Sequence, residues 1–262
     1  MKKSLFVAAT VLLALIMLVG CSKTQAETPT ADPSVSPAQP STPTEAEGSA
    51  KHEDTSKNES AAFSDSIDAA YAQQIDRYYT AISSKWNEGT YFEHEMSALT
   101  AYYYEGNALE NIGFTCMDLD GDNSRELIIG AIQNAEQQPL VFEIWTLQNG
   151  VPVMLAQSGS RNRYYTQYAK DDGIWTIANE AESSAATHAV YYLQLSEGKF
   201  EVTQGVLFDA AANEKAPWFM AYDLDWNVSN DTPIDKDTAD AVMEAGRNIY
   251  TAMEYIPYSL YK

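Results

Sequence analysis

Positive charge is scarce in this sequence. It holds 16 lysines and arginines against 37 aspartates and glutamates, so the formal charge is −21 at pH 7. Residues 64–262 carry −19 of this charge, once +2 from Lys2 and Lys3 and −4 from residues 22–63 are set aside. Binding to phosphate backbones requires clustered lysine and arginine, so nucleic acid is a poor partner. Cations and neutral ligands suit such an acidic domain better.

The motifs of common catalytic sites are also missing. Three histidines occur, at positions 52, 94 and 188, and none has the second histidine four residues away that a zinc-protease helix requires. The region after residue 63 contains neither a G-x-S-x-G nucleophile motif nor a glycine-rich phosphate loop. We therefore predict no catalytic residue.

No hydrophobic run is long enough to span a membrane. The longest, residues 5–19, has about 15 residues, whereas a spanning helix needs about 20. It follows Met1-Lys2-Lys3, which predicts a signal peptide over residues 1–20. The tetrapeptide Leu18-Val19-Gly20-Cys21 resembles the bacterial lipobox. The resemblance implies that Cys21 is lipidated and becomes the first residue of a secreted protein anchored on the extracytoplasmic face of the cell membrane; an ordinary signal peptide is the alternative.

A tether and one domain follow Cys21. Residues 21–63 are rich in proline, serine, threonine and glutamate, and prolines stand at 29, 33, 37, 40 and 43. Such a segment cannot bury enough apolar area to fold, so we expect a disordered linker. Residues 64–262 are long enough for a single globular domain. With Cys21 lipidated, Cys116 has no disulfide partner and is predicted to be a small buried hydrophobe.

Apolar residues recur at helical spacing where this domain begins. The first set is Ile67, Tyr71, Ile75, Tyr78, Ile82 and Trp86. It predicts a helix that Asn87-Glu88-Gly89 ends. A second helical segment is predicted over 92–104, with at least one of its three consecutive tyrosines, 102–104, in the core. A final helix is predicted after Asp235, with an apolar side at positions 239, 242, 243, 246, 249 and 250.

Turn-forming pairs separate runs of β-type residues between these helices. The pairs are Asn149-Gly150, Asp172-Gly173 and Glu197-Gly198. They predict β-hairpins and hence an antiparallel meander. The apolar tail 256–261 is expected to dock on the sheet. The predicted fold class is α+β, with N-terminal helices, an antiparallel β-meander of about 7–9 strands, and a C-terminal helix packed on the sheet.

One loop carries a candidate metal site. Its candidate ligands stand at alternate positions: Asp118, Asp120, Asp122, Ser124 (through its backbone carbonyl) and Glu126. Calcium takes six to eight oxygen ligands, and alternate residues of a curled loop can aim oxygens at one point. Four carboxylates this close repel one another unless a cation lies between them. An EF-hand is excluded, because its twelfth position requires glutamate and holds Ile129 here.

The segment Asp118–Gly130 resembles two known patterns. One is the calcium-binding hairpin loop of FG-GAP repeats, and the other is the DLDGDGxxEL signature of Firmicutes lipoproteins of unassigned function. The second covers more of the chain, from lipobox and tether to early helices, acidic hairpin and strands. The first implies a bound Ca²⁺, which we expect to be structural because its ligands would pin a strand turn; an acidic turn without metal is the alternative. Asn123 replaces the usual glycine and should tolerate the left-handed backbone that glycine provides. Glu126 stands where the FG-GAP loop has aspartate, and it matches the lipoprotein signature.

These observations favour a membrane-tethered binding or interaction module, stabilised by Ca²⁺, whose ligand is an extracellular protein or glycan. An extracytoplasmic hydrolase acting on cell-wall polymers or glycans is the alternative, and it would use paired acids such as Asp223 and Asp225. A purely structural lipoprotein is a third interpretation. Arg161 and Arg163 form the densest basic spot, which could receive an anionic ligand group or serve in surface salt bridges.

The lipid anchor gives a first testable prediction. Changing Cys21 to serine removes the thiol that carries the diacylglycerol, whose two acyl chains give durable anchoring. The variant should leave the membrane fraction, and fractionation followed by immunoblotting measures this. A serine variant that still sediments with membranes would contradict the lipobox interpretation.

Overall fold

The computed structural model describes residues 69–132, 138–170 and 173–262, and their fold is α+β. The signal segment, Cys21 and the tether lie outside these residues. The helices are η1 (Ala69–Tyr71), α2 (Ala72–Ser83), α3 (Glu88–Glu93), η2 (Ala98–Tyr103), α4 (Ala108–Asn111), η3 (Val228–Asn230), α5 (Lys236–Arg247) and η4 (Tyr258–Leu260). The strands are β1 (Ile112–Met117), β2 (Glu126–Ala131), β3 (Leu140–Gln148), β4 (Val151–Gln157), β5 (Asn162–Ala169), β6 (Ile174–Ser184), β7 (Thr187–Ser196), β8 (Lys199–Asp209), β9 (Trp218–Ala221), β10 (Thr232–Pro233) and β11 (Ile256–Pro257).

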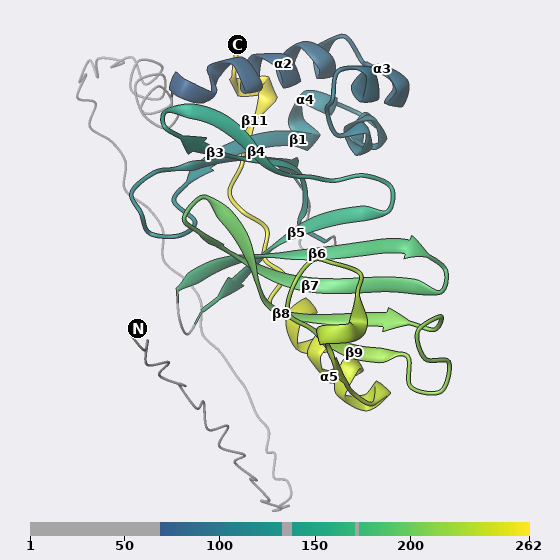
Figure 1. Cartoon of the computed structure of the whole chain (residues 1–262). Coiled ribbons are helices and arrows are strands. Elements are labelled where there is room, and N and C mark those ends of the chain that lie inside the picture. Colours follow the sequence, from purple (N-terminus) through teal and green to yellow (C-terminus); the bar gives the residue numbers. More distant parts are fainter. Residues whose placement is uncertain (1–68, 133–137, 171–172) are drawn as a thin grey trace, which may run out of the picture. The chain divides into compact units, whose positions relative to one another are not determined.

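The strands form one antiparallel sheet in the order β10-β9-β8-β7-β6-β5-β3-β2-β1-β11, and β4 pairs with β3 off this path. Eleven strands exceed the predicted 7–9. The additional strands include β10 and β11, which are only two residues long, too short for an alternation of apolar and polar residues to reveal. In Figure 1, α2, α3 and α4 lie at the β1–β3 end of the sheet, and α5 lies near β8 and β9.

The first helices differ from the prediction. Helix α2 ends at Ser83, and Asn87 begins α3 instead of ending α2, because its side chain accepts a hydrogen bond from the Thr90 backbone N–H at 3.0 Å. Asparagine is among the best helix N-caps, so it favours a new start at this position. The predicted helix over 92–104 is divided into α3 and η2, with Glu95 in a left-handed conformation between them.

The three consecutive tyrosines behave as core packing predicts. Tyr103 packs edge-on against Phe142, with ring centroids 5.2 Å apart. The Tyr104 hydroxyl lies 2.6 Å from that of Tyr91. Tyr102 alone is exposed. The expectation that at least one faces the core is confirmed.

The predicted turns are confirmed where the structure describes them. Asn149 and Gly150 have φ values of 54° and 76°, and Glu197 and Gly198 have 50° and 70°. These left-handed pairs join β3 to β4 and β7 to β8, as tight hairpins require. Asp172 lies outside the described residues.

The sheet is buried on both faces. One core cluster packs α2, α3 and η2 against residues such as Phe114 and Phe142. The second cluster contains residues from both β2–β4 and β6–β9, including Ile144 and Leu207, so the sheet curls around it. Cys116 is half-buried against the first cluster, less buried than predicted.

The last described residues close one edge of the sheet. Ile256 and Pro257 pair with Phe114 and Gly113 of β1, and Tyr258 is fully buried in the first core cluster. The predicted docking of the apolar tail is therefore confirmed.

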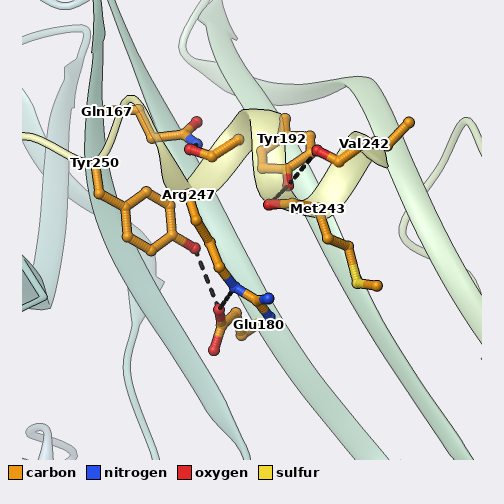
Figure 2. Close-up of polar contacts among 8 residues, drawn as sticks. Gln167, Glu180, Tyr192, Val242, Met243, Arg247 and Tyr250 are labelled. Atoms are coloured by element: carbon orange, nitrogen blue, oxygen red, sulfur yellow. Dashed lines mark hydrogen bonds and ion pairs between the residues drawn. The ribbon is translucent and has the colours of Figure 1, made fainter. Parts of the chain in front are cut away.

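Helix α5 packs on the sheet through polar contacts (Figure 2). The Tyr192 hydroxyl donates to the carbonyls of Val242 and Met243, at 3.3 and 3.4 Å. Gln167 donates to the Gly246 carbonyl at 2.7 Å. Gly246 has no room for a Cβ, because the Tyr192 ring occupies that space.

The end of α5 corrects one expectation. The helix stops at Arg247, so Ile249 and Tyr250 are not on its apolar side as predicted. Tyr250 instead stacks on Tyr165 of β5, with ring centroids 5.2 Å apart. The apolar spacing continued past the helix because Tyr250 also packs on the sheet, whereas Ile249 is exposed.

Candidate metal centre and binding cleft

The acidic segment forms the loop of the β1–β2 hairpin. Met117 and Glu126 face each other in the last pair of the ladder, so residues 118–125 make the loop. Gly121 and Asn123 both have left-handed backbones, with φ values of 79° and 70°. The expectation that Asn123 can replace glycine is confirmed, because asparagine tolerates this region better than most residues.

Aspartate side chains hold the curl of this loop. Asp118 accepts the N–H groups of Gly121 and Asn123 on its two oxygens, at 2.7 and 3.0 Å. Asp120 accepts the N–H of Asp122 at 3.3 Å. Asp122 accepts the N–H of Ser124 at 2.6 Å. Short acidic side chains commonly cap turns in this way, so these contacts stabilise the curl.

Glu126 closes the loop from inside the protein. Only 1% of its surface is exposed. Its Oε2 accepts the Leu119 N–H at 3.0 Å, and its Oε1 accepts the Thr146 hydroxyl at 2.9 Å. Burial raises the pKa of Glu126 to about 6; the two hydrogen bonds oppose this shift, and the nearby charges of Asp120 and Asp122 reinforce it.

Three of the five predicted ligands come together. One carboxylate oxygen each from Asp118, Asp120 and Glu126 lie within 4.8 Å of one another. Two oxygens on the same Ca²⁺ can be no further apart than twice the bond length, about 5 Å, so these three residues fit a calcium ion. Asp122 is outside this group. Ser124 lies beside Asp122, because its backbone N–H donates a hydrogen bond to the Asp122 carboxylate.

The negative charges of Asp118 and Asp122 act on the carboxyl of Asp120. Burial is the largest cause of the raised pKa of Asp120, and the charges of Asp122 and Asp118 add to it. Among the described residues, the three ion pairs involve none of these acids. A divalent cation would relieve the repulsion.

Two open pockets lie together elsewhere on the described surface. The first, here called the tyrosine pocket, has a volume of about 480 Å³ and is lined by Leu99, Tyr102, Tyr103, Gln138, Leu140, Ser160, Arg163 and Tyr165. The second, the arginine pocket, has about 250 Å³ and includes Arg161, Arg163, Glu180, Glu182, His188, Met243 and Arg247 in its lining. Ser160 and Arg163 line both, so the two pockets adjoin at these residues and are together called the cleft here.

The arginine pocket joins distant segments. Arg247 approaches Glu180 with its Nε 3.7 Å from the carboxylate, and the Tyr250 hydroxyl donates to the same oxygen at 3.2 Å (Figure 2). The Arg161 guanidinium donates to the Ser183 carbonyl at 3.4 Å. The sequence indicated Arg161 and its neighbour at 163, but not Arg247, since only the docking of α5 brings that residue to β5 and β6.

The remaining candidates have structural surroundings. His94 stacks on Trp86, with centroids 4.4 Å apart, and His188 stacks on Phe208 at 4.7 Å. No group of three metal-ligating residues in the described ranges includes a histidine or a cysteine. Asp223 and Asp225 are exposed in the β9–β10 loop, where each accepts a backbone N–H of that loop.

No family model, no curated protein and no solved structure matches this chain. The resemblances of the acidic hairpin therefore rest on its own residues. In the ranges that the structure describes, no helix combines the length and the apolar character needed to cross a membrane.

The buried carboxyl of Glu126 predicts a pH dependence in metal-free protein. Its folded pKa of about 6 lies above the ordinary 4.5, so the neutral form stabilises the fold. That stability is fully present below pH 4.5 and is lost as pH rises through 6. The free energy of unfolding should fall by on the order of 1–2 kcal/mol more in the wild type than in Glu126→Gln over this window. Urea unfolding with a chelator measures it.

A charge-removing control separates this effect from the general repulsion of an acidic protein. Glu105 is exposed, so Glu105→Gln should keep the pH slope of the wild type. Parallel slopes for the wild type and Glu126→Gln would contradict the assignment.

Proposed function

We propose that this chain is a lipid-anchored, extracytoplasmic binding module whose β1–β2 hairpin holds a structural Ca²⁺ and whose cleft binds an acidic glycan. The lipobox and the proline-rich segment of residues 21–63 support the anchor and the tether. The observation that carries the binding function is the meeting of Arg161, Arg163 and Arg247 in one pocket of a strongly acidic chain.

The metal would be held by Asp118, Asp120 and Glu126, with Asp122 and the Ser124 carbonyl as further candidates. Calcium would supply positive charge to acids that otherwise repel one another. It would also fix Leu119, which lies in the second core cluster and donates its N–H to Glu126. The expected effect is therefore a more stable sheet edge.

The chemistry of the cleft favours an acidic saccharide. Arginine presents a planar fork of donors that matches a carboxylate. Tyr102 and Tyr103 offer ring surface and hydroxyl groups beside Arg163, a mixture of apolar and polar groups typical of ligand sites. Glu180 pairs with Arg247, and Glu182 also lines the arginine pocket, so its three arginines and two glutamates leave a formal charge of +1 for a ligand.

Calcium should raise the midpoint of thermal unfolding. A ligand at about 100-fold excess over its Kd stabilises the folded state by about 2.7 kcal/mol, or roughly 5–10 °C for a domain of this size. Asp120→Asn keeps a cap for the Asp122 N–H but removes one charge, and it should lose most of this shift. Differential scanning calorimetry with Ca²⁺ and with chelator measures both proteins.

Asp209 provides the matched control, because it also caps backbone N–H groups, those of Ala211 and Ala212, in a different turn. Asp209→Asn should keep the full calcium shift. The metal site is refuted if the wild type shows no shift at millimolar Ca²⁺.

The cleft should bind a uronic-acid oligosaccharide more tightly than its neutral counterpart. Arg163 lines both pockets, so Arg163→Gln should weaken binding about tenfold through loss of a charge-assisted contact. Isothermal titration calorimetry on the calcium-loaded protein measures the two Kd values. Lys199→Gln, which removes an exposed cation from β8, should leave them unchanged.

Two outcomes would overturn this assignment. Equal affinity for the acidic and neutral oligosaccharides would show that the arginines do not read a carboxylate. Cleavage of the oligosaccharide during incubation, detected by mass spectrometry, would favour the hydrolase instead.

A further inference from the structure

A second hairpin loop repeats the residue spacing of the calcium-loop candidate. In the β1–β2 loop, acidic or hydroxyl residues stand at relative positions one, three, five, seven and nine. The loop between β9 and β10 places oxygen-bearing side chains at the same positions: Asp223, Asp225, Asn227, Ser229 and Asp231. These are residue types that bind hard cations through oxygen.

The hydrogen bonds repeat as well. Asp223 accepts the N–H of Asp225 at 3.1 Å, and Asp225 accepts that of Asn227 at 2.8 Å. Asn227 accepts the N–H of Ser229 at 3.1 Å. At position nine, Asp231 accepts the backbone N–H of Tyr222, as Glu126 accepts one from the start of its own loop. The contacts at positions three and five are common to both loops, whereas Asp118 at position one accepts the N–H groups three and five residues further on and Asp223 accepts the one two residues further on.

A buried hydroxyl points into this second loop. Tyr191 of β7 is 1% exposed, and its hydroxyl has no hydrogen-bond partner among the described residues. Tyr191, Gly205 and Ala221 form one row across β7, β8 and β9. A Cβ on Gly205 would stand 2.7 Å from Cδ1 of Tyr191 and 3.3 Å from the Ala221 carbonyl. The ring thus crosses β8 toward the residue just before the loop.

The loop folds over that ring. Trp226 packs edge-on against Tyr191, with ring centroids 6.4 Å apart and planes at 78°. Val228 packs against the second core cluster, which also contains Tyr191. A buried hydroxyl without a hydrogen-bond partner is costly, so such a group calls for a ligand or a water.

The charges around the hydroxyl are all negative. Burial first, and then the charges of Asp231, Asp223 and Asp225, raise the pKa of Tyr191. The pKa of Asp231 is raised by burial and by the same two aspartates. None of the three takes part in an ion pair within the ranges described.

We propose that the β9–β10 loop is a second divalent-cation site, in which Asp223, Asp225 and Asp231 hold Ca²⁺ and the Tyr191 hydroxyl contributes a neutral oxygen, directly or through a bound water. Only the β1–β2 loop brings three described carboxylates within 4.8 Å of one another. The second loop must therefore tighten around its ion, and it binds more weakly than the first. This site is independent of the proposed glycan binding.

Terbium luminescence tests the site, because Tb³⁺ replaces Ca²⁺ and emits when a nearby tryptophan is excited. Trp226 lies inside the second loop. The full chain, freed of metal, should bind two Tb³⁺ ions, and Ca²⁺ should displace both. Trp226→Phe should remove most emission from the weaker ion. Asp225→Asn, which keeps a cap for the Asn227 N–H, should weaken that ion about tenfold.

Three further variants separate the two loops. Asp120→Asn should affect only the tighter ion, so the first site can fail while the second stands. Tyr191→Phe removes one oxygen and keeps the ring; it should weaken the second ion about threefold and leave the first unchanged. Asp209→Asn should affect neither ion. The proposal is overturned if the chain binds one Tb³⁺ that Asp120→Asn abolishes, or if Trp226→Phe and Asp225→Asn behave like Asp209→Asn.

Discussion

A single buried carboxylate, that of Glu143, ties the helical segment to the sheet. It is almost fully buried in β3, and it accepts the Ser97 N–H at 3.0 Å, the Gln157 amide at 3.1 Å and the Trp145 indole N–H at 3.0 Å. Burial raises its pKa, and these donors oppose that shift. A buried charge without hydrogen-bond partners is very costly. The three donors, which come from the residue before η2, from β4 and from β3 itself, must therefore be in place when the Glu143 carboxylate is buried. The carboxylate therefore sets where the helices sit on the sheet.

The same junction creates the cleft. The β3 edge is shared, since Leu140 and Val141 pair with β5 while later residues pair with β4. Ser158, between β4 and β5, donates to the Val141 carbonyl at 2.5 Å and accepts the Tyr164 N–H at 3.0 Å. Its own carbonyl accepts the Ser97 hydroxyl at 2.7 Å. Strands that diverge from a shared edge leave an opening beside them, and the tyrosine pocket lies there, with Leu140 and Ser160 in its lining.

Local chemistry explains what the sequence could predict. Asn149-Gly150 and Glu197-Gly198 adopt the left-handed backbones that their residue types favour, and the β1–β2 hairpin curls through contacts within a few residues. Three of its five predicted ligands meet; Asp122 does not join them.

Contacts between distant segments could not be predicted. Glu126 meets Thr146 of β3, and Arg247 reaches β6, only because of strand order and helix docking. The Asn87 cap was misassigned because the same residue types end one helix and begin the next.

The pairing of β11 with β1 has a consequence for the order of events during biogenesis. Residues 256 and 257 cover an edge that was synthesised about 140 residues earlier. Contacts of such long sequence separation form late, because a large loop must close before they contribute. Until residue 258 arrives, Phe114 lacks the ring of Tyr258, 5.1 Å away in the finished core, and β1 presents an open edge. During that interval the edge of β1 can pair with a strand of another chain, so the incomplete chain is most prone to aggregation before its last residues have folded.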